Sequence, residues 1–233
     1  MGDESRNVSA TIWARGGKRV FDAFAAAILL IILSPFLVIA VALVKLTSRG
    51  PIFFSQRRVG KNGVPFRLPK FRTMRADRTP DPKELVPLDH ADIIPVGRFL
   101  RRFKIDELPQ LTSVLKGEMS LVGPRPTLLD QVEAYDDFRR QRLLVRQGIT
   151  GLAQVNGDTA ISWDQRILFD IAYVRRCSLL LDMRILLRTC WAIPAGDPAN
   201  PRPFDQTPYA RYVTPPKDYE ARSPTRCSTQ HER

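Results

Sequence analysis

Two adjacent carboxylates, Asp106 and Glu107, offer the clearest chemistry in the sequence. Neighbouring side chains on a helix point about 100° apart, so one carboxylate can attack or bind a metal while the other moves a proton. Arg101 lies just upstream within a run of basic residues, and nearby guanidinium groups keep an aspartate ionised and hold phosphates. The plainer alternative is an acidic pair at a helix end that only balances its basic neighbours.

Two further basic features are suited to phosphate. Prolines flank Arg125 on both sides, and the rigid backbone that they impose suits a bidentate guanidinium contact, although such a motif can also be an ordinary turn. A compact basic cluster at residues 70–75 contains Lys70 and Arg72. These two side chains could bind phosphate or could meet only lipid headgroups.

The composition narrows the class of partner and of chemistry. The chain has 233 residues and a formal charge of +12, which implies an anionic partner such as nucleic acid, an anionic bilayer or a phosphate-rich substrate. Only two histidines are present, so catalysis must run mainly on carboxylates and basic groups. The three cysteines are scattered and predict neither a metal site nor a disulfide framework, which fits a reducing cytoplasm.

The catalytic candidates follow an apolar run of about 22 residues, from Ala23 to Val44, long enough to cross a bilayer as a straight helix. Basic residues flank the run on both sides, whereas a spanning helix carries its basic excess on the cytoplasmic side. Ser34 and Pro35 interrupt the run, and proline bends or breaks a helix. We therefore expect a re-entrant membrane helix that is broken at Ser34-Pro35 and leaves by the same face. A single spanning helix, a signal peptide and a core helix are the alternatives.

The remaining segments predict a small α+β unit. Residues 52–59 and 65–71 flank an Asn-Gly turn and predict a β-hairpin. Residues 76–92 are expected to form a loop, and residues 96–110 a basic helix at the membrane surface. Further helices are expected at 128–147 and 162–175. The apolar segment 179–193 suits either a core helix or an interfacial one.

These predictions give a domain organisation. A polar leader covers residues 1–17, the re-entrant helix 18–48, and a catalytic unit on the cytosolic face 49–194. A proline-rich tail at 195–233 is expected to be disordered. The fold class is mainly α with a short β-hairpin, with interfacial amphipathic helices beside the membrane helix.

A series of motifs runs in order through roughly residues 16–194. It consists of KRVFD at 18–22, the Ser34-Pro35 break, GPIFF at 50–54, QRRVG at 56–60, KFRTM at 70–74, Leu100-Arg101, DELPQ at 106–110, GEMSLVGPRP at 117–126, GITGLAQVNG at 148–157 and the segment 173–182. In this order the motifs resemble the bacterial sugar transferases, or monotopic phosphoglycosyl transferases. The chain resembles their short form, which lacks an additional multi-span N-terminal domain.

The resemblance implies an activity and a location. A UDP-sugar would donate a sugar-1-phosphate to a polyprenyl phosphate, in particular undecaprenyl phosphate, and UMP would be released. This is the first membrane step of polysaccharide or glycoconjugate assembly, at the cytoplasmic face of the bacterial inner membrane. Bilayer lipids are then partners and nucleic acid is not, and surface arginines could support a homodimer.

The resemblance also implies residue roles. Asp106 would be the nucleophile and would form a covalent phosphosugar intermediate, which predicts ping-pong kinetics. Mg²⁺ would offset the diphosphate charge with Asp106 as a ligand, and Glu107 would assist as a proton carrier or metal ligand. The phosphate contacts would come from four basic residues: Arg101, Arg125, Lys70 and Arg72.

The chain departs from the family at two places. Related chains usually carry Ser-Leu or a similar pair before Asp-Glu, where this chain has Lys104-Ile105. Many carry Arg-Asn where this chain has Asp158-Thr159, which removes a positive charge near a segment associated with the donor.

Two rival functions are kept beside the enzyme. A basic membrane-anchored adaptor that binds anionic lipid or nucleic acid would explain the charge but not the carboxylate pair. A glycoside hydrolase would need two carboxylates that straddle a sugar, which adjacent residues do poorly.

Overall fold

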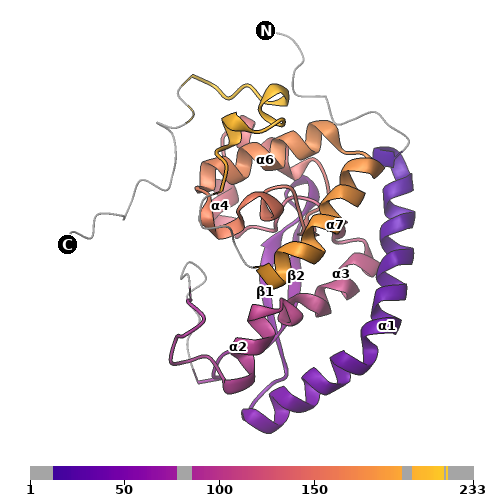
Figure 1. Cartoon of the computed structure of the whole chain (residues 1–233), viewed down its shortest axis with the longest axis vertical. Helices are drawn as coiled ribbons and strands as arrows, with labels where there is room; N and C mark the ends of the chain where they lie inside the picture. The colour runs from indigo at the N-terminus through magenta and orange to yellow at the C-terminus, as the bar shows by residue number, and fades with distance from the viewer. Residues whose placement is uncertain (1–12, 78–85, 196–200, 218, 220–233) are drawn as a thin grey trace, which may run out of the picture.

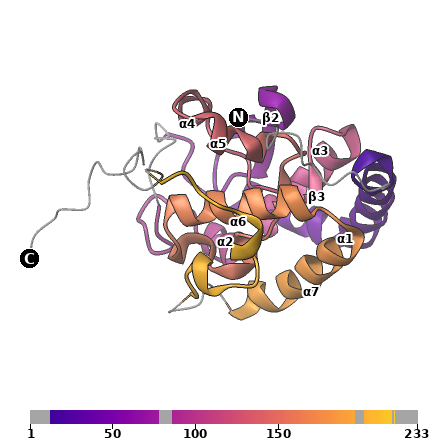
Figure 2. The same ribbon diagram turned by 90° about the horizontal axis from the view of Figure 1, so that it is seen from above.

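The computed structural model describes residues 13–77, 86–195, 201–217 and 219. Within these residues the protein is mainly helical, with two small two-stranded sheets. A long helix lies along one side of the molecule, and the other elements pack together beside it (Figure 1; Figure 2 shows the same helix at one edge). The mainly helical class with a β-hairpin is as the sequence predicts.

The long helix is α1, Lys18–Thr47, and it follows a short π-helical turn at Trp13–Gly17. It is long and apolar enough to cross a membrane, and only a small part of it is buried. Helix α1 continues through Pro35 and bends partway along its length (Figure 1). The Ser34 hydroxyl donates to the carbonyl of Ile31 at 2.8 Å. The expected interruption is therefore a bend within one helix.

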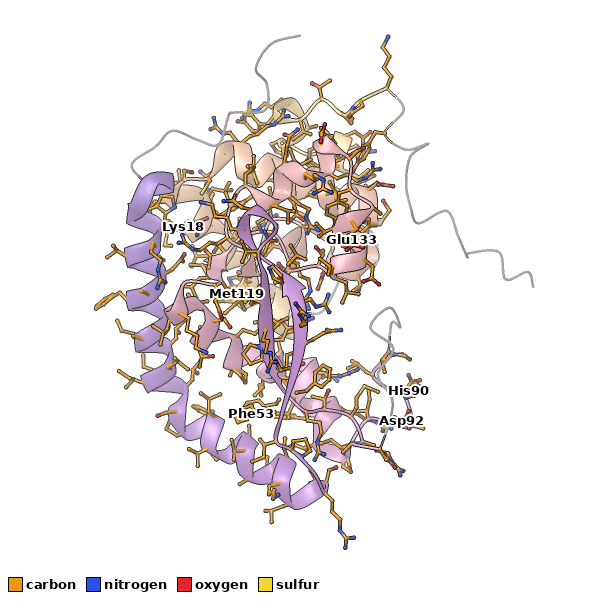
Figure 3. The ribbon with its side chains drawn as sticks, turned by 180° about the vertical axis from the view of Figure 1, so that it is seen from behind. Lys18, Phe53, His90, Asp92, Met119 and Glu133 are labelled. Carbon is orange, nitrogen blue, oxygen red and sulfur yellow. The ribbon has the colours of Figure 1, made fainter. Side chains whose placement is uncertain are left out.

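Both ends of α1 are attached to the same domain. At the N-terminal end, Lys18 forms an ion pair with Asp182 at 2.7 Å, and Figure 3 shows Lys18 at the end of α1 that meets the domain. At the C-terminal end, Arg72 donates to the carbonyls of Ser48 at 2.9 Å and Arg49 at 2.6 Å. The first and last turns of the apolar helix therefore lie against one folded body.

The predicted hairpin is confirmed. Strands β1, Phe53–Val59, and β2, Pro65–Phe71, pair antiparallel, and Val59 lies opposite Pro65. Asn62 and Gly63 in the turn both have positive φ, 56° and 81°, which an Asn-Gly turn adopts readily. The prolines of β2 are tolerated because the sheet has two strands and β2 is an edge.

The basic helix expected over 96–110 is wrong as a single helix. Helix α2 covers only Pro95–Arg102, and a 3-10 helix, η4, covers Ile105–Gln110 before α3, Leu111–Lys116. The expected helix at 128–147 is also divided, into α4, Leu129–Glu133, α5, Asp137–Arg140, and a 3-10 turn at Gln141–Leu143.

A second sheet supports the centre of the domain. Strands β3, Ser120–Val122, and β4, Gly148–Thr150, pair in parallel. Helix α6, Trp163–Arg176, is the main core helix, and Ile167, Phe169 and Ile171 are fully buried.

Helix α7, Leu179–Ala195, has one side buried in the core and the other exposed at the surface of the protein. Leu181 and Ile185 are buried, whereas Leu180, Leu187 and Trp191 are 62%, 66% and 79% exposed. Its exposed side therefore carries large apolar side chains together with Arg184 and Arg188, whereas the outer face of α1 is apolar and uncovered.

Part of the segment expected to be a disordered tail is folded. Phe204, Val213 and Tyr219 are buried, and Phe204 packs edge-to-face on Phe169 of α6, with ring centroids 4.9 Å apart. The prediction was based on proline content, but a few large apolar side chains are enough to hold the segment on α6. The remaining residues of the tail, like the leader before Trp13, fall outside the described residues.

Candidate active site

The carboxylate pair lies on η4, separate from the arginine-bearing helix. Helix α2 ends because Lys104 adopts a left-handed conformation with φ 56°, and the amide of Glu107 donates to the carbonyl of Lys104 at 3.2 Å. A 3-10 helix has three residues per turn, so Asp106 and Glu107 point in clearly different directions. Both side chains are nevertheless buried, with 7% of each residue exposed.

Glu107 is held between two cations. Lys70 of β2 donates to its Oε1 at 2.7 Å, and Arg125 donates to the same atom at 2.7 Å and to Oε2 at 3.4 Å. Burial alone would favour the protonated acid, but the charges of Arg125 and Lys70 outweigh it and keep the pKa of Glu107 well below its usual range. Glu107 is therefore ionised at neutral pH and fixes the positions of two basic groups.

Asp106 has the opposite environment. Its Oδ1 is buried and has no hydrogen-bond partner among the described residues. Burial, and then the neighbouring charge of Glu107, raise the pKa of Asp106 to about 6, although Lys70, Arg101 and Lys104 oppose the shift. A desolvated carboxylate without hydrogen-bond donors suits a nucleophile or an incomplete metal site.

Arg58 is a basic residue of this cluster that the sequence analysis did not single out. It lies on β1, and its Nη2 donates to Gln56 at 2.6 Å. Burial and the charge of Arg125 lower the pKa of Arg58 to about 10, and Glu107 partly opposes this shift. The alternation of β1 was the available signal, because Arg58 lies on the opposite face of the strand from the exposed Arg57.

Strands β3 and β4 and the side chain of Arg142 fix the backbone of the Pro-Arg-Pro segment. Gly123 and Gly148 bring the ends of β3 and β4 so close that a Cβ on Gly148 would stand 2.1 Å from the Gly123 nitrogen. The carbonyl of Arg125 accepts from Arg142 at 3.0 Å, and Arg142 also binds Asp170 at 2.5 Å in a buried pair. This frame fixes the backbone from which the Arg125 side chain reaches Glu107, whose charge raises the pKa of Arg125.

The other predicted basic residues separate into two groups. Arg101 acts electrostatically on Asp106, and its Nε donates to Thr73 at 2.9 Å. Arg72 instead caps the C-terminal end of α1. Its Nη1 lies where a Cβ on Gly50 would stand 2.4 Å away, so glycine at position 50 makes this contact possible. The structure thus brings Lys70, Arg101 and Arg125 to the carboxylates and gives Arg72 a role at α1.

An apolar groove opens beside the carboxylates. Its volume is about 320 Å³, and it lies between the second half of α1, α2 and the start of η4. Its lining side chains are all apolar: Phe36, Ile39, Ala40, Leu43, Phe99, Leu100, Phe103 and Ile105. Ile105, which lines the groove, directly precedes Asp106 in the chain, so this end of the groove lies next to the carboxylate pair in sequence.

Comparison with known families decides the class of protein. The profile of the family described as "Bacterial sugar transferase" matches residues 13–196. The chain belongs to the bacterial sugar transferase family. This confirms the resemblance drawn from the motifs, and with it the expectation of an enzyme.

The names of relatives of this sugar transferase refer to sugar transfer and to exopolysaccharide production. An uncharacterized sugar transferase of Bacillus subtilis, EpsL, is 45% identical over 172 residues, 74% of this chain and 84% of its own. The exopolysaccharide production protein ExoY of Rhizobium meliloti is 37% identical over 191 residues, 76% of this chain and 84% of its own. A UDP-glucose:undecaprenyl-phosphate glucose-1-phosphate transferase of Caulobacter vibrioides is 41% identical over 196 residues, 78% of this chain and 71% of its own.

Proposed function

We propose that this sugar transferase moves a sugar-1-phosphate from a UDP-sugar to undecaprenyl phosphate and releases UMP, with Asp106 as the nucleophile. The proposal rests on the difference between the hydrogen-bonding environments of Asp106 and Glu107. Glu107 is saturated by two cations, whereas Asp106 Oδ1 is buried without a partner beside the same cations. The names of the relatives supply the classes of donor and acceptor.

The proposed reaction has two displacements at one phosphorus atom. In the first, an Asp106 oxygen attacks the β-phosphorus of the donor, the bond to the bridging oxygen breaks, and UMP leaves with that oxygen. In the second, an oxygen of the lipid phosphate attacks the same phosphorus and the bond to Asp106 breaks. The product is a polyprenyl diphosphate-sugar, and the aspartate is regenerated with no net change in charge.

The surrounding residues have distinct roles in this proposal. Arg125 and Lys70 are placed by Glu107 where they can bind the donor's phosphates, and Arg101 adds positive potential at Asp106. Glu107 itself has both oxygens occupied, so we assign it to positioning these cations. Arg58 adds further positive charge next to Arg125.

The site fits Mg²⁺. No group of three or more metal-ligating side chains is found in the described part of the chain, but Mg²⁺ commonly uses one or two carboxylates together with substrate phosphates and water. The unpartnered Asp106 Oδ1 is the atom that would contribute a ligand. When bound, the ion would offset charge on the donor's diphosphate.

The placement of α1 supports a re-entrant arrangement. A helix whose two ends bind one domain, through Lys18 and through Arg72, cannot carry that domain on both sides of a bilayer. We propose that α1 enters and leaves by the cytoplasmic face, with its exposed apolar side in lipid. The groove beside Asp106 would then receive the first isoprene units of the acceptor, whose phosphate lies at the membrane surface.

The test is UMP release by the full chain in detergent, with Mg²⁺, a panel of UDP-sugars and undecaprenyl phosphate. We expect release with one or a few donors, and loss of at least a thousandfold in Asp106→Asn. Mass spectrometry of wild type with donor alone should show one phosphosugar attached at Asp106. The adaptor alternative predicts no UMP release and lipid binding that Asp106→Asn leaves unchanged. Release of UDP in place of UMP would also contradict the proposal.

A further inference from the structure

An ion pair joins the catalytic turn to a distant segment of the chain. Nζ of Lys104 lies 3.7 Å from Oδ2 of Asp158. Lys104 is two residues before Asp106, and Asp158 begins the 3-10 turn Asp158–Ala160. The turn that precedes the carboxylate pair and the turn that begins at Asp158 therefore meet in space.

Both partners have an uncommon backbone conformation. Lys104 has φ 56° and Asp158 has φ 38°, and Asn62 is the other non-glycine residue with positive φ in the described part of the chain. Such conformations cost energy and concentrate at functional sites. Asp158 is fixed further by Gly157, where a Cβ would stand 2.8 Å from Pro201 of the folded C-terminal segment.

Lys104 differs from the other basic residues near Asp106 in how it is held. Lys70 and Arg125 bind Glu107 at 2.7 Å, and Arg101 donates to Thr73 at 2.9 Å. The distance of 3.7 Å from Lys104 to Asp158 exceeds hydrogen-bond length. The Lys104 side chain is also 48% exposed, whereas that of Asp158 is 12% exposed, so the lysine can exchange partners at little energetic cost.

The surroundings of Asp158 place it at the rim of the site. Its charge acts on Arg125 as well as on Lys104, and Lys104 acts on Asp106. A diphosphate that reached Asp106 and Arg125 would therefore come within range of Lys104 and would compete with the Asp158 carboxylate for it.

We propose that Lys104 is a further phosphate-binding residue of this enzyme, and that Asp158 is its counterion between turnovers. On donor binding, Lys104 leaves Asp158 and contacts the diphosphate. The inference rests on the proposed function and adds a cation, and a competitor for it, to that site. Because Asp158 competes with the donor for Lys104, removing its charge should strengthen donor binding. A purely structural ion pair predicts no such gain.

The experiment compares donor KM and kcat in Lys104→Met, Asp158→Asn and the double variant. Lys104→Met should raise the donor KM about tenfold, because a charge-assisted contact to phosphate is lost. Asp158→Asn should lower the donor KM about two- to fivefold, because Lys104 no longer has to leave a carboxylate. In the Lys104→Met background, Asp158→Asn should leave the KM unchanged. Lys61→Met is the matched control, because Lys61 is an exposed lysine in the hairpin turn.

Two results would overturn the proposal. If both single variants raised the donor KM, the pair would be a structural tie between the two turns. If Asp158→Asn lowered the KM equally with and without Lys104, Asp158 would act on the donor directly. Thermal melts of all variants separate either result from loss of folding.

A second readout keeps the inference separate from the proposed function. Binding of inorganic pyrophosphate with Mg²⁺, measured by calorimetry, should be tightest in Asp158→Asn, intermediate in wild type and weakest in Lys104→Met. If no UDP-sugar gave UMP, the proposed function would fail, but the order of pyrophosphate affinities would still test the Lys104–Asp158 pair. If UMP were released but the order were absent, only the inference would fail.

Discussion

At the scale of single residues, adjacent carboxylates have opposite protonation tendencies because of their neighbours. Glu107 binds Lys70 and Arg125 at 2.7 Å, whereas Asp106 is buried with one oxygen unpartnered. The sequence predicted that both residues and both cations belong to the site. It could not predict the pairing, because Lys70 and Arg125 lie 37 and 18 residues from Glu107 in the chain and only the fold brings them together.

The first prediction at this scale concerns the pH dependence of activity. The pKa of Asp106 is raised to about 6, and the attacking form is the carboxylate. The value of kcat/KM for the donor should therefore rise about tenfold per pH unit below pH 6 and level off above it. Initial rates of UMP release between pH 4.5 and 8 measure this. A flat profile between pH 5 and 7 would show that Asp106 does not limit the first displacement.

The second prediction concerns stability. Because the pKa of Asp106 is raised in the folded protein, the native state binds more protons than the unfolded state between about pH 4 and pH 6. Asp106 therefore lowers the free energy of unfolding as pH rises, and the whole of this destabilisation is present above the native pKa. Asp106→Asn should therefore be more stable than wild type at pH 7.5, by about 1–3 kcal/mol or about 2–12 °C in Tm. The difference should vanish near pH 4. A lower Tm for Asp106→Asn at pH 7.5 would contradict the assigned environment.

At the scale of elements, prediction from sequence succeeded where structure is local. The Asn62-Gly63 dipeptide specifies its own turn, and the apolar run that forms α1 can be recognised from sequence hydropathy alone. The single helix expected at 96–110 was wrong because Lys104, a good helix former, adopts a left-handed conformation that ends α2. Strands β3 and β4 are only three residues each and lie in separate parts of the chain, so no local pattern indicates that they pair.

The third prediction tests the groove between α1 and α2. Phe99 and Phe103 pack with their rings tilted and their centroids 4.9 Å apart, and both line the groove. Replacing both by serine should reduce acceptor-dependent turnover about tenfold, because apolar contact with an isoprenoid chain is lost. The single burst of UMP with donor alone should remain, because it needs no acceptor.

The control for the groove is Val64→Ser, a change at an exposed apolar residue in the hairpin turn. It should alter neither the burst nor the turnover. Equal loss of both steps in the Phe99/Phe103 variant would place the groove on the donor's side of the reaction.

At the scale of the whole molecule, α1 and the domain form one unit through buried polar contacts. Asp182 accepts from Lys18 at 2.7 Å, from Trp13 at 2.9 Å and from Tyr173 at 2.7 Å. Asp22, on the next turn of α1, accepts from Ser120 at 2.7 Å. The sequence marked Lys18, Asp22, Ser120, Tyr173 and Asp182 only as parts of motifs and did not single out Trp13, whose partner lies 169 residues away.

The fourth prediction follows from this network. Asp182→Asn removes the nearer of the two buried carboxylates that pair with Lys18, the other being Asp22 at 3.7 Å, and breaking a buried pair typically costs about 3–5 kcal/mol. We expect a Tm about 6–12 °C below wild type in a detergent melt, whereas Asp205→Asn, at an exposed aspartate, should melt like wild type. An unchanged Tm in Asp182→Asn would mean that the Lys18–Asp182 pair contributes nothing to the attachment of α1.

The attachment of α1 at both ends also fixes the distance between the middle of this helix and the active site. Because the first and last turns of this helix are fixed to one body, the proposed re-entrant arrangement would make the depth of its bent middle in lipid determine how far Asp106 stands from the plane of the headgroups. The helix would then act as a spacer of fixed length, and the reach of the enzyme toward a lipid phosphate would depend on the bilayer without any moving part.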